Sequence, residues 1–393
     1  MLTDNTIKIV KSTVPLLAEA GTVITEHFYK RMFSHNPELK NIFNMTNQAK
    51  GKQQFALFNA LAAYAQNIDK LAVLKDALER INHKHASLNI LPEHYPIVGG
   101  HLIATLKELI PDQFTPEVEY AWREAYAVLS DICITEEAAL YAHNKNTQGG
   151  WSGTRQFEMT NKQQESELVT SFELTPVDGK EVISHKPGQY LGIKIKPDNC
   201  QYEQIRQYSI SQKANGKNYR ISVKKELFPK PGVVSNYLHS LPQGSVVELY
   251  PPAGDFYLRD NATPTVLVSA GVGQTPMMAM LETLLSDKHT EKIIYLHACE
   301  TPKQHSFAND LNELSRLYNR LQTATWFNQG GEGCNYTGLM NLRDLDTELP
   351  INNGEFYLCG PVNFMAFIKT QLLDLGVDNS RIHYELFGPH QDL

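Results

Sequence analysis

The stretch Gly271-Val272-Gly273-Gln274-Thr275-Pro276 decides the fold of the last third of the chain. It follows the apolar run 265–270, and helical spacing of apolar residues resumes directly after it. Glycines let a backbone approach a phosphate closely, and Pro276 suits the start of a helix whose N–H groups attract anions. Because Pro276 replaces the last glycine of Gly-x-Gly-x-x-Gly, a generic strand–turn–helix remains the alternative.

Strands and helices alternate on both sides of this turn. The sequence predicts strands over 265–270, 292–298, 323–327 and 355–359, and helices over 277–285, 306–318 and 364–375. This alternation is typical of parallel βαβ units. Such sheets bind ligands at the carboxyl ends of their strands, where Cys359-Gly360-Pro361 also lies.

The middle of the chain has short β-rich runs separated by turns such as Pro187-Gly188 and Asn215-Gly216. The runs cover 155–160, 167–175, 190–195, 206–211, 219–223 and 246–250. They predict an antiparallel barrel or sandwich. One run contains Arg206-Gln207-Tyr208-Ser209, in which a guanidinium suits a pyrophosphate and an aromatic ring suits a flavin. Alone, this motif fits an edge strand equally well.

The first 145 residues have apolar residues at helical spacing, interrupted by breakers such as Asn36-Pro37 and Gly99-Gly100. We expect roughly six to eight helices, enough for a compact helical domain. The fold class is therefore multidomain: helical, then antiparallel β, then parallel α/β. Lengths of this order suit two or three domains.

Composition excludes several functions. A net charge of −7 without a basic stripe argues against nucleic acid as a partner. The 5 cysteines are scattered and include no Cys-x-x-Cys pair, which suits a reducing cytoplasm. The polar start predicts no signal peptide, and no apolar run is long enough to span a membrane. We therefore expect a cytoplasmic protein without stable membrane insertion.

The segment Arg80-Ile81-Asn82-His83-Lys84-His85 supplies a candidate metal ligand, His85. An iron-bound flat cofactor would need an aromatic wedge and polar groups on its other face, and Phe43, Gln53, Leu57 and Tyr29 are candidates. Gln53 and Leu57 stand at i, i+4, so they share one helix face. Each residue alone is better explained by core packing or by a surface position.

The arrangement Phe28-Tyr29, Asn36-Pro37, Phe43, Gln53, Leu57 and Lys84-His85 resembles the globin domain of the flavohaemoglobins, which join a globin to a flavin reductase. The resemblance covers essentially the whole chain. It implies a globin domain over 1–147, an FAD-binding barrel over 148–260 and an NAD(P)-binding domain over 261–393.

The resemblance also implies roles in the globin domain. His85 would be the proximal ligand of a haem b iron, and Tyr29, Phe43, Gln53 and Leu57 would line the distal side. Tyr95 and Glu137 would orient His85 and make its imidazole more electron-donating. By composition Glu136 is the equal of Glu137, and only the family register selects Glu137.

In the reductase half, the resemblance assigns three groups of residues. Tyr190 and Arg206-Gln207-Tyr208-Ser209 would bind FAD, with the segment 232–236 at its phosphates. Gly271-Val272-Gly273-Gln274-Thr275-Pro276, Cys359 and Gly360 would bind NADH or NADPH. Leu386-Phe387-Gly388-Pro389 would pack near the flavin, while Lys84 and Glu385 would set the haem and flavin potentials. The loop 227–231 is longer and richer in proline than the family pattern.

The function implied is nitric oxide dioxygenase: NAD(P)H reduces FAD, FAD reduces the haem iron, and O2 at the haem oxidises NO to nitrate. Two alternatives remain, a flavin reductase for quinones, ferric iron or peroxides, and an oxygen-binding or sensing haemoglobin. We expect a monomer. The lack of an arginine cluster near Glu300 and Lys303 favours NADH, and occupation of the distal pocket by a lipid stays open.

Overall fold

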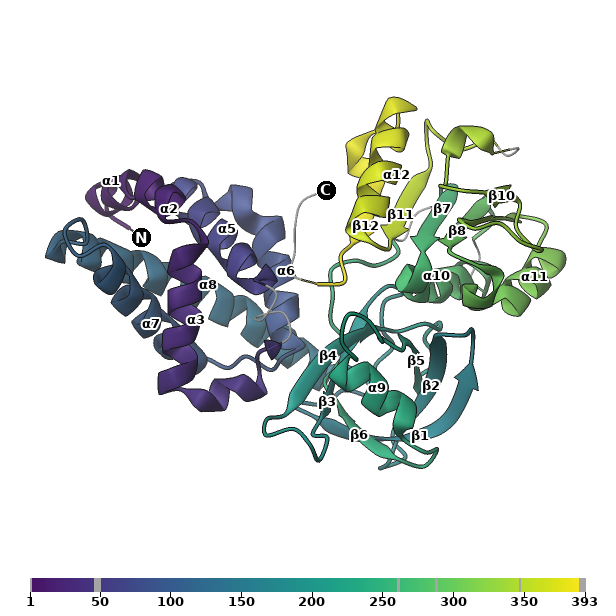
Figure 1. Ribbon diagram of the computed structural model, residues 1–393, viewed down its shortest axis with the longest axis horizontal. Coiled ribbons are helices and arrows are strands. Elements are labelled where there is room, and N and C mark those ends of the chain that lie inside the picture. The colour runs from purple at the N-terminus through teal and green to yellow at the C-terminus, as the bar shows by residue number, and fades with distance from the viewer. Residues whose placement is uncertain (1, 46–50, 260–261, 287–288, 346–347, 389–393) are drawn as a thin grey trace. The chain divides into compact units, whose positions relative to one another are not determined.

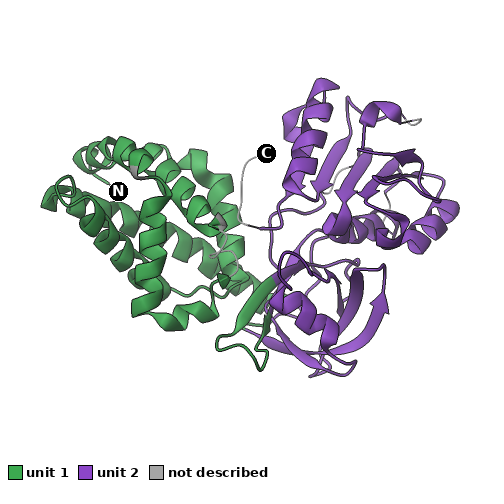
Figure 2. Cartoon of the chain, viewed as in Figure 1, with its two compact units in different colours: residues 1–147, 151–153, 194–206 green, residues 148–150, 154–193, 207–393 purple. Residues whose placement is uncertain are grey.

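The computed structural model describes residues 2–45, 51–259, 262–286, 289–345 and 348–388. The chain divides into two compact units, which Figure 2 colours separately. The first unit holds residues 1–147, 151–153 and 194–206, and the second holds 148–150, 154–193 and 207–393. The predicted boundaries of three domains, after residues 147 and 260, remain a prediction.

The part of the first unit before residue 148 is helical, as predicted (Figure 1). Its α-helices are α1 (Asp4–Ser12), α2 (Val14–Ala20), α3 (Thr22–His35), α5 (Lys52–Gln66), α6 (Lys75–Ala86), α7 (His94–Leu109) and α8 (Pro116–Asn146). The short 3-10 helices η1 (Pro37–Asn41) and η2 (Leu71–Leu74) connect them. α3 packs against α5 and α7, and α6 packs against α8. These helix pairs surround the interior of the unit.

An antiparallel sheet follows in the chain. Its strands are β1 (Arg155–Gln164), β2 (Val169–Pro176), β3 (Tyr190–Ile195), β4 (Gln204–Ser209), β5 (Tyr219–Lys224) and β6 (Val246–Leu249), in the order β4-β3-β6-β1-β2-β5. An antiparallel bridge between Ile210 and Ile221 joins the two ends of this order. The sheet therefore curls toward a barrel, whose interior buries Phe157, Phe172 and Tyr219 completely.

The last part of the chain forms a parallel sheet. Its strands are β7 (Thr265–Ala270), β8 (Ile293–Cys299), β9 (Leu321–Phe327), β10 (Tyr336–Thr337), β11 (Glu355–Cys359) and β12 (Ile382–Glu385), in the order β10-β9-β8-β7-β11-β12. The chain runs outward from β7 to β10 and then returns to place β11 on the other side of β7. The switch point between β7 and β11 is where doubly wound sheets bind nucleotides.

Helices cover both faces of the parallel sheet. α10 (Gln274–Ser286) and α11 (Ala308–Leu317) bury one face and α12 (Val362–Asp374) the other. α10 is also fixed to the antiparallel sheet through Glu282. Its carboxylate accepts one hydrogen bond from Arg220 Nη2 at 2.7 Å and a second from the Lys213 backbone N–H at 2.9 Å. The helix that begins at the glycine turn is therefore held by both sheets of the second unit.

The predicted helical, antiparallel and parallel parts are confirmed, but three short elements were not predicted. They are α9 (Val233–Ser240), β10 and β12. β12 has four residues, and only Ile382 is buried, so it has no apolar alternation to detect. Its pairing with β11 depends on the sheet edge that β11 offers.

His185 makes the stability of the second unit sensitive to acid. It is 4% exposed, its Nε2 lies 2.9 Å from the Gln212 carbonyl oxygen, and burial lowers its pKa from 6.5 to about 4. In the unfolded chain this imidazole therefore binds a proton below pH 6.5, whereas in the folded chain it binds one only below about pH 4. Stability is complete above pH 6.5 and falls with pH, by about 2 kcal/mol at pH 5.

We expect His185→Gln to remove this part of the acid sensitivity. Urea unfolding at pH 7.5 and pH 5 should show a loss about 2 kcal/mol smaller in the variant than in the wild type. His143→Gln, at an exposed position on α8, is the matched control and should keep the wild-type pH dependence. Equal losses in wild type and His185→Gln would contradict the assignment.

Candidate functional site

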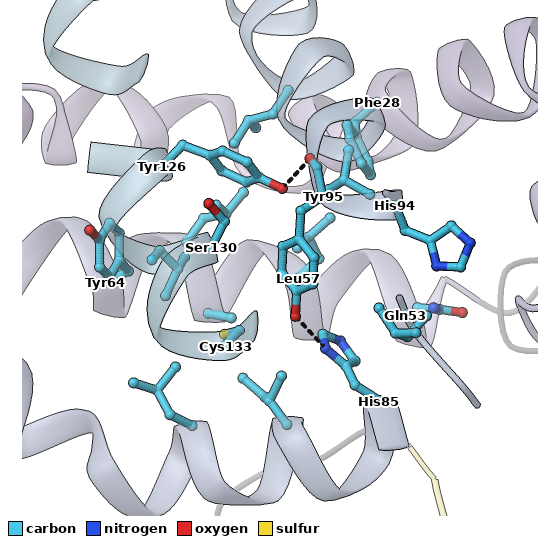
Figure 3. A pocket seen from close by; sticks show the side chains of 18 of the residues that line it. Phe28, Gln53, Leu57, Tyr64, His85, His94, Tyr95, Tyr126, Ser130 and Cys133 are labelled. Atoms are coloured by element: carbon cyan, nitrogen blue, oxygen red, sulfur yellow. Dashed lines mark hydrogen bonds between the residues drawn. The ribbon is translucent and has the colours of Figure 1, made fainter. Parts of the chain in front are cut away.

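A cavity with a volume of about 290 Å³ lies inside the helical unit, and apolar side chains form most of its wall (Figure 3). α3, α5, α6, α7 and α8 all contribute to this wall. The predicted site residues that line the cavity are Tyr29, Phe43, Gln53, Leu57, His85 and Tyr95. Four helices that are separate in the sequence, α3, α5, α6 and α7, together with Phe43 after η1, thus bring the candidate residues to one space.

His85 stands in the last turn of α6, where it lines the cavity and keeps 32% of its side chain exposed. Its Nδ1 lies 2.7 Å from Glu137 Oε1 and 3.2 Å from the Tyr95 hydroxyl oxygen. The Tyr95 hydroxyl donates to the same Glu137 oxygen at 2.5 Å. Figure 3 shows Tyr95 reaching down to the His85 ring. One carboxylate oxygen of Glu137 therefore contacts both His85 and Tyr95.

Burial of Glu137 and Tyr95 determines which groups of this network donate hydrogen bonds and which accept them. Glu137 is 2% exposed and can only accept hydrogen bonds when ionised. Burial raises the pKa of Tyr95, and its hydrogen bond to Glu137 raises it further, so the phenol keeps its proton. If Nδ1 of His85 donates to Glu137, its Nε2 carries the lone pair. An imidazole in this tautomer is ready to bind a metal ion.

The structure distinguishes two neighbouring glutamates that the sequence alone could not distinguish. Glu136 is exposed on α8, whereas Glu137 is buried against His85. One residue along a helix turns the side chain by about 100°, so only one of the two can face α6. The role of Glu137 as the orienting group remains a proposal.

Aromatic rings and one amide also belong to the cavity wall or pack against it. The rings of Tyr29 and Phe43 meet edge to face with their centroids 6.0 Å apart, and Phe33 packs against Phe43 in the same way at 5.4 Å. Oε1 of Gln53 is buried and has no hydrogen-bond partner among the described residues. A buried polar atom of this kind costs free energy unless something bound in the cavity satisfies it.

These features fit a haem. The cavity is mainly apolar, as a porphyrin requires, and His85 presents an imidazole whose Nδ1 lies against a carboxylate, so its other nitrogen could bind iron. Gln53 brings an unsatisfied polar atom to the wall of the same cavity. The described residues contain no group of three or more His, Cys, Asp and Glu side chains that could hold a metal ion by themselves. An iron ion held by a porphyrin and a single imidazole needs no such group of protein ligands.

The predicted flavin residues lie on β3 and β4. Tyr190 begins β3 and is 9% exposed, and Arg206, Gln207 and Tyr208 are half-buried on β4. Ser209 ends β4 and is buried. Arg206 donates from Nη1 to the Ile205 carbonyl at 2.7 Å, which holds its guanidinium beside the strand. The side chains of β4 thus offer a cation, a ring and a hydroxyl in close succession.

The segment after β5 forms a helix start, as a phosphate site requires. Gly232 is the N-cap of α9, and no acidic residue stands in the first turn. No side chain caps the first N–H groups of the helix. They are thus able to bind a phosphate. The preceding loop, residues 226–232, contains the longer, proline-rich segment 227–231 noted in the sequence.

The glycine turn follows β7 as predicted. Gly271–Gly273 form the 3-10 helix η3, and α10 begins at Gln274 with Thr275 and Pro276 buried. A Cβ on Gly273 would stand 2.2 Å from the Cys359 carbonyl oxygen, so the turn and the end of β11 touch through their backbones. Gly360 has φ +159°, at the margin of what other residues adopt. Val272 lies between the two glycines of the turn.

The residues near the carboxyl terminus differ in how far they are buried. Glu385 pairs with Cys359 in the β11–β12 register, Leu386 is buried, and Phe387 is 50% exposed. Gly388 is exposed, and Pro389 lies outside the described residues. Lys84 belongs to the first unit and Glu385 to the second, so a pairing between them remains a prediction.

Comparison with known proteins matches all three parts of the chain. Models of the globin family, the oxidoreductase FAD-binding domain and the oxidoreductase NAD-binding domain match residues 26–133, 156–257 and 267–370. A flavohemoprotein from Vibrio cholerae serotype O1 is 52% identical over 396 aligned positions, which cover 100% of both chains. The chain belongs to the flavohemoprotein family.

Solved structures agree with this assignment. The crystal structure of a flavohemoglobin from Malassezia yamatoensis, which contains FAD and haem, is 26% identical with a TM-score of 0.89 and covers 98% of this chain and 100% of its own. The FAD/NAD-binding domain of a nitric oxide dioxygenase from V. cholerae is 45% identical with a TM-score of 0.56. It covers 60% of this chain and 99% of its own.

This flavohemoprotein is therefore an oxidoreductase with globin, FAD-binding and NAD-binding domains, and the predicted haem, FAD and nicotinamide cofactors are confirmed at that level. Among the helices of the described residues, none has the length and apolar content to cross a membrane. The monomeric state, the cytoplasmic location and a lipid in the cavity remain predictions.

Sequence reasoning missed several residues of the cavity wall, among them His94, Tyr126 and Cys133. The Tyr126 hydroxyl donates to the Tyr95 carbonyl oxygen at 2.7 Å and so fixes the start of α7. Burial raises the pKa of Cys133 to about 11, which keeps this thiol neutral beside Tyr95. A small or aromatic residue at helical spacing is indistinguishable from ordinary core in the sequence.

Proposed function

We propose that this flavohemoprotein is a nitric oxide dioxygenase that catalyses 2 NO + 2 O2 + NAD(P)H → 2 NO3⁻ + NAD(P)⁺ + H⁺. The observation that carries the proposal is the network in which Glu137 Oε1 accepts a hydrogen bond from the Tyr95 hydroxyl and lies 2.7 Å from His85 Nδ1 at the cavity wall. Simple oxygen storage does not require such an electron-donating ligand or a hydride supply. The relative from V. cholerae named a nitric oxide dioxygenase supports the same choice.

When bound, a haem supplies an iron centre that binds small diatomic molecules and exchanges single electrons. His85 would hold the iron through Nε2, because its Nδ1 faces Glu137. The buried Glu137 carboxylate makes the imidazole more basic, and Tyr95 fixes the carboxylate. On the other side, Tyr29 and Gln53 would orient the small substrates, while Phe43 and Leu57 exclude water.

When bound, FAD accepts a hydride and gives electrons singly, which joins a two-electron donor to a one-electron acceptor. Tyr190 and the β4 residues Arg206-Gln207-Tyr208-Ser209 would hold it, with Phe387 beside the ring. The turn Gly271-Val272-Gly273-Gln274-Thr275-Pro276 would bind the NAD(P)H pyrophosphate through its N–H groups. Cys359 and Gly360 would lie against the nicotinamide ring. Lys84 and Glu385 would tune the two potentials.

One assay separates the candidate functions. Consumption of NO by the full-length protein is followed with NADH, in the presence and in the absence of O2. We expect sustained consumption with nitrate as product only when both are present. A reductase for quinones, ferric iron or peroxides would oxidise NADH with those acceptors and ignore NO. An oxygen-binding haemoglobin would take up O2 once without turnover. Either result would contradict the proposal.

We further propose that Glu300 selects NADH over NADPH. It follows β8, the second strand of the parallel sheet, where nucleotide-binding folds place the acid that contacts the adenosine ribose. Its Oε2 accepts a hydrogen bond from Asn328 Nδ2 at 2.9 Å, which directs the carboxylate. A 2′-phosphate would meet this negative charge and be repelled.

Glu300→Gln is expected to lower the ratio of kcat/KM for NADH to kcat/KM for NADPH by roughly tenfold, mainly through a lower KM for NADPH. Steady-state reduction of ferricyanide with the two nucleotides measures the ratio. Glu313→Gln, at an exposed position on α11, is the control and should leave it unchanged. An unchanged ratio in Glu300→Gln would refute the role of this carboxylate.

A further inference from the structure

An exposed aromatic side chain stands on the loop between β5 and α9. Phe228 is 85% exposed, and its neighbour Leu227 is 40% exposed. An aromatic side chain kept in water forgoes the favourable transfer of its apolar surface. Isolated exposed apolar residues are common on proteins, so the exposure alone decides nothing. The construction of the loop supplies the further evidence.

The loop of residues 226–232, here called the Phe228 loop, is closed at its base. The Gly232 N–H donates to the Glu226 carbonyl oxygen at 2.9 Å. The Asn236 side-chain amide donates to the same oxygen at 2.7 Å and to the Gly232 carbonyl oxygen at 2.8 Å. Pro229 and Pro231 restrict φ within the loop. Phe228 is therefore presented by a preorganised segment, which lowers the entropy lost on binding.

The surroundings of the loop suit an anionic ligand with a flat ring. The chain passes from Gly232 directly into α9, whose first turn contains no acidic residue. Lys225 and Lys230 are exposed on the same short segment as Phe228. The FAD-binding family model spans residues 156–257 and so includes the whole loop. FAD joins its pyrophosphate to its adenine through one ribose, so the adenine must lie near the N–H groups that bind the phosphates.

We propose that Phe228 is the platform on which the adenine ring of this chain's own FAD stacks. The inference rests on the FAD binding described above and adds the contact that holds its adenylate half. The ring of Phe228 offers an apolar face to the π-face of adenine, and stacking would remove both from water. An anionic membrane surface would also attract an exposed phenylalanine flanked by lysines. Continuity with the start of α9 favours FAD.

The test compares two flavins on full-length protein from which the flavin has been removed. FAD and FMN share the isoalloxazine ring and the first phosphate, but only FAD carries adenine. Quenching of flavin fluorescence gives both dissociation constants for wild type, Phe228→Ala, Phe228→Trp and Phe367→Ala. Phe367 lies on α12 and is 44% exposed, so its truncation is a control for the loss of an exposed phenylalanine.

We expect Phe228→Ala to weaken FAD binding about tenfold, the scale of one base–aromatic stack, and to leave FMN binding unchanged. Phe228→Trp should restore the affinity for FAD, and Phe367→Ala should behave as wild type. Unchanged FAD binding in Phe228→Ala would overturn the proposal, as would equal weakening of FAD and FMN. Loss of binding to phosphatidylglycerol vesicles with unchanged FAD affinity would assign the loop to a membrane instead. Failure of the wild type to bind FAD at all would contradict the domain assignment itself.

Discussion

Replacing His85 by alanine is expected to abolish O2-dependent NO consumption while NADH-driven reduction of ferricyanide stays within about twofold of wild type. Among the described residues of the cavity wall, His85 is the histidine whose ring nitrogen lies against a buried carboxylate. Without it, a bound haem would lose the residue proposed to hold its iron and the electron donation that Glu137 would promote. The residues proposed for hydride transfer, except Arg206, belong to the other unit, and none of them lines the cavity, so this activity should survive. An NO electrode and a ferricyanide assay on the same preparation measure both activities.

His83→Ala is the matched control for this variant. It removes the same side chain from the same helix, two residues earlier, at a position that does not line the cavity. We expect His83→Ala to keep NO consumption and the haem absorption band. NO consumption surviving in His85→Ala, or loss of ferricyanide reduction there, would contradict the assigned ligand.

Replacing Gly273 by alanine is expected to lower kcat/KM for NADH-dependent flavin reduction by at least about a hundredfold. The added Cβ would stand 2.2 Å from the Cys359 carbonyl oxygen and 2.7 Å from the Gly360 backbone nitrogen. Backbone atoms cannot move aside as a flexible side chain can, so the turn must separate from the end of β11. Both proposed nicotinamide contacts would then be displaced. Anaerobic stopped-flow absorbance of the flavin measures the rate.

Two controls distinguish this local effect from misfolding. Dithionite should still reduce the flavin of Gly273→Ala, because it bypasses the nucleotide site. Gly271→Ala adds a Cβ that meets nothing within 4 Å, although φ is +52°, so we expect a milder loss of roughly tenfold. Wild-type reduction by NADH in Gly273→Ala would show that the contact between turn and strand is unimportant.

Local patterns predicted much of the fold because each depends on neighbouring residues. Helical spacing identified the first unit, and the alternation of strands and helices identified the parallel sheet. The shared face of Gln53 and Leu57 followed from i, i+4 geometry, and both line the cavity. β12 was not predicted because its four residues form a strand through pairing with β11 and have no sequence pattern of their own.

The long-range contacts of the site could not be read from the sequence. His85 and Glu137 are 52 residues apart, and nothing local distinguishes Glu137 from the exposed Glu136. The same is true of Arg220 and Glu282, which are 62 residues apart and join the two sheets of the second unit. Such pairs are set by how helices and sheets pack. A family resemblance can supply their register, but composition and periodicity cannot.

The central claim is that reducing equivalents pass from the nicotinamide nucleotide through the flavin to the metal held by His85. Anaerobic mixing of the full-length protein with NADH, followed by absorbance at flavin and haem wavelengths, tests it most directly. We predict that the flavin bleaches first and that the haem band then shifts to the ferrous position. A bleached flavin beside a haem that stays ferric, or a haem reduced before the flavin, would contradict the account.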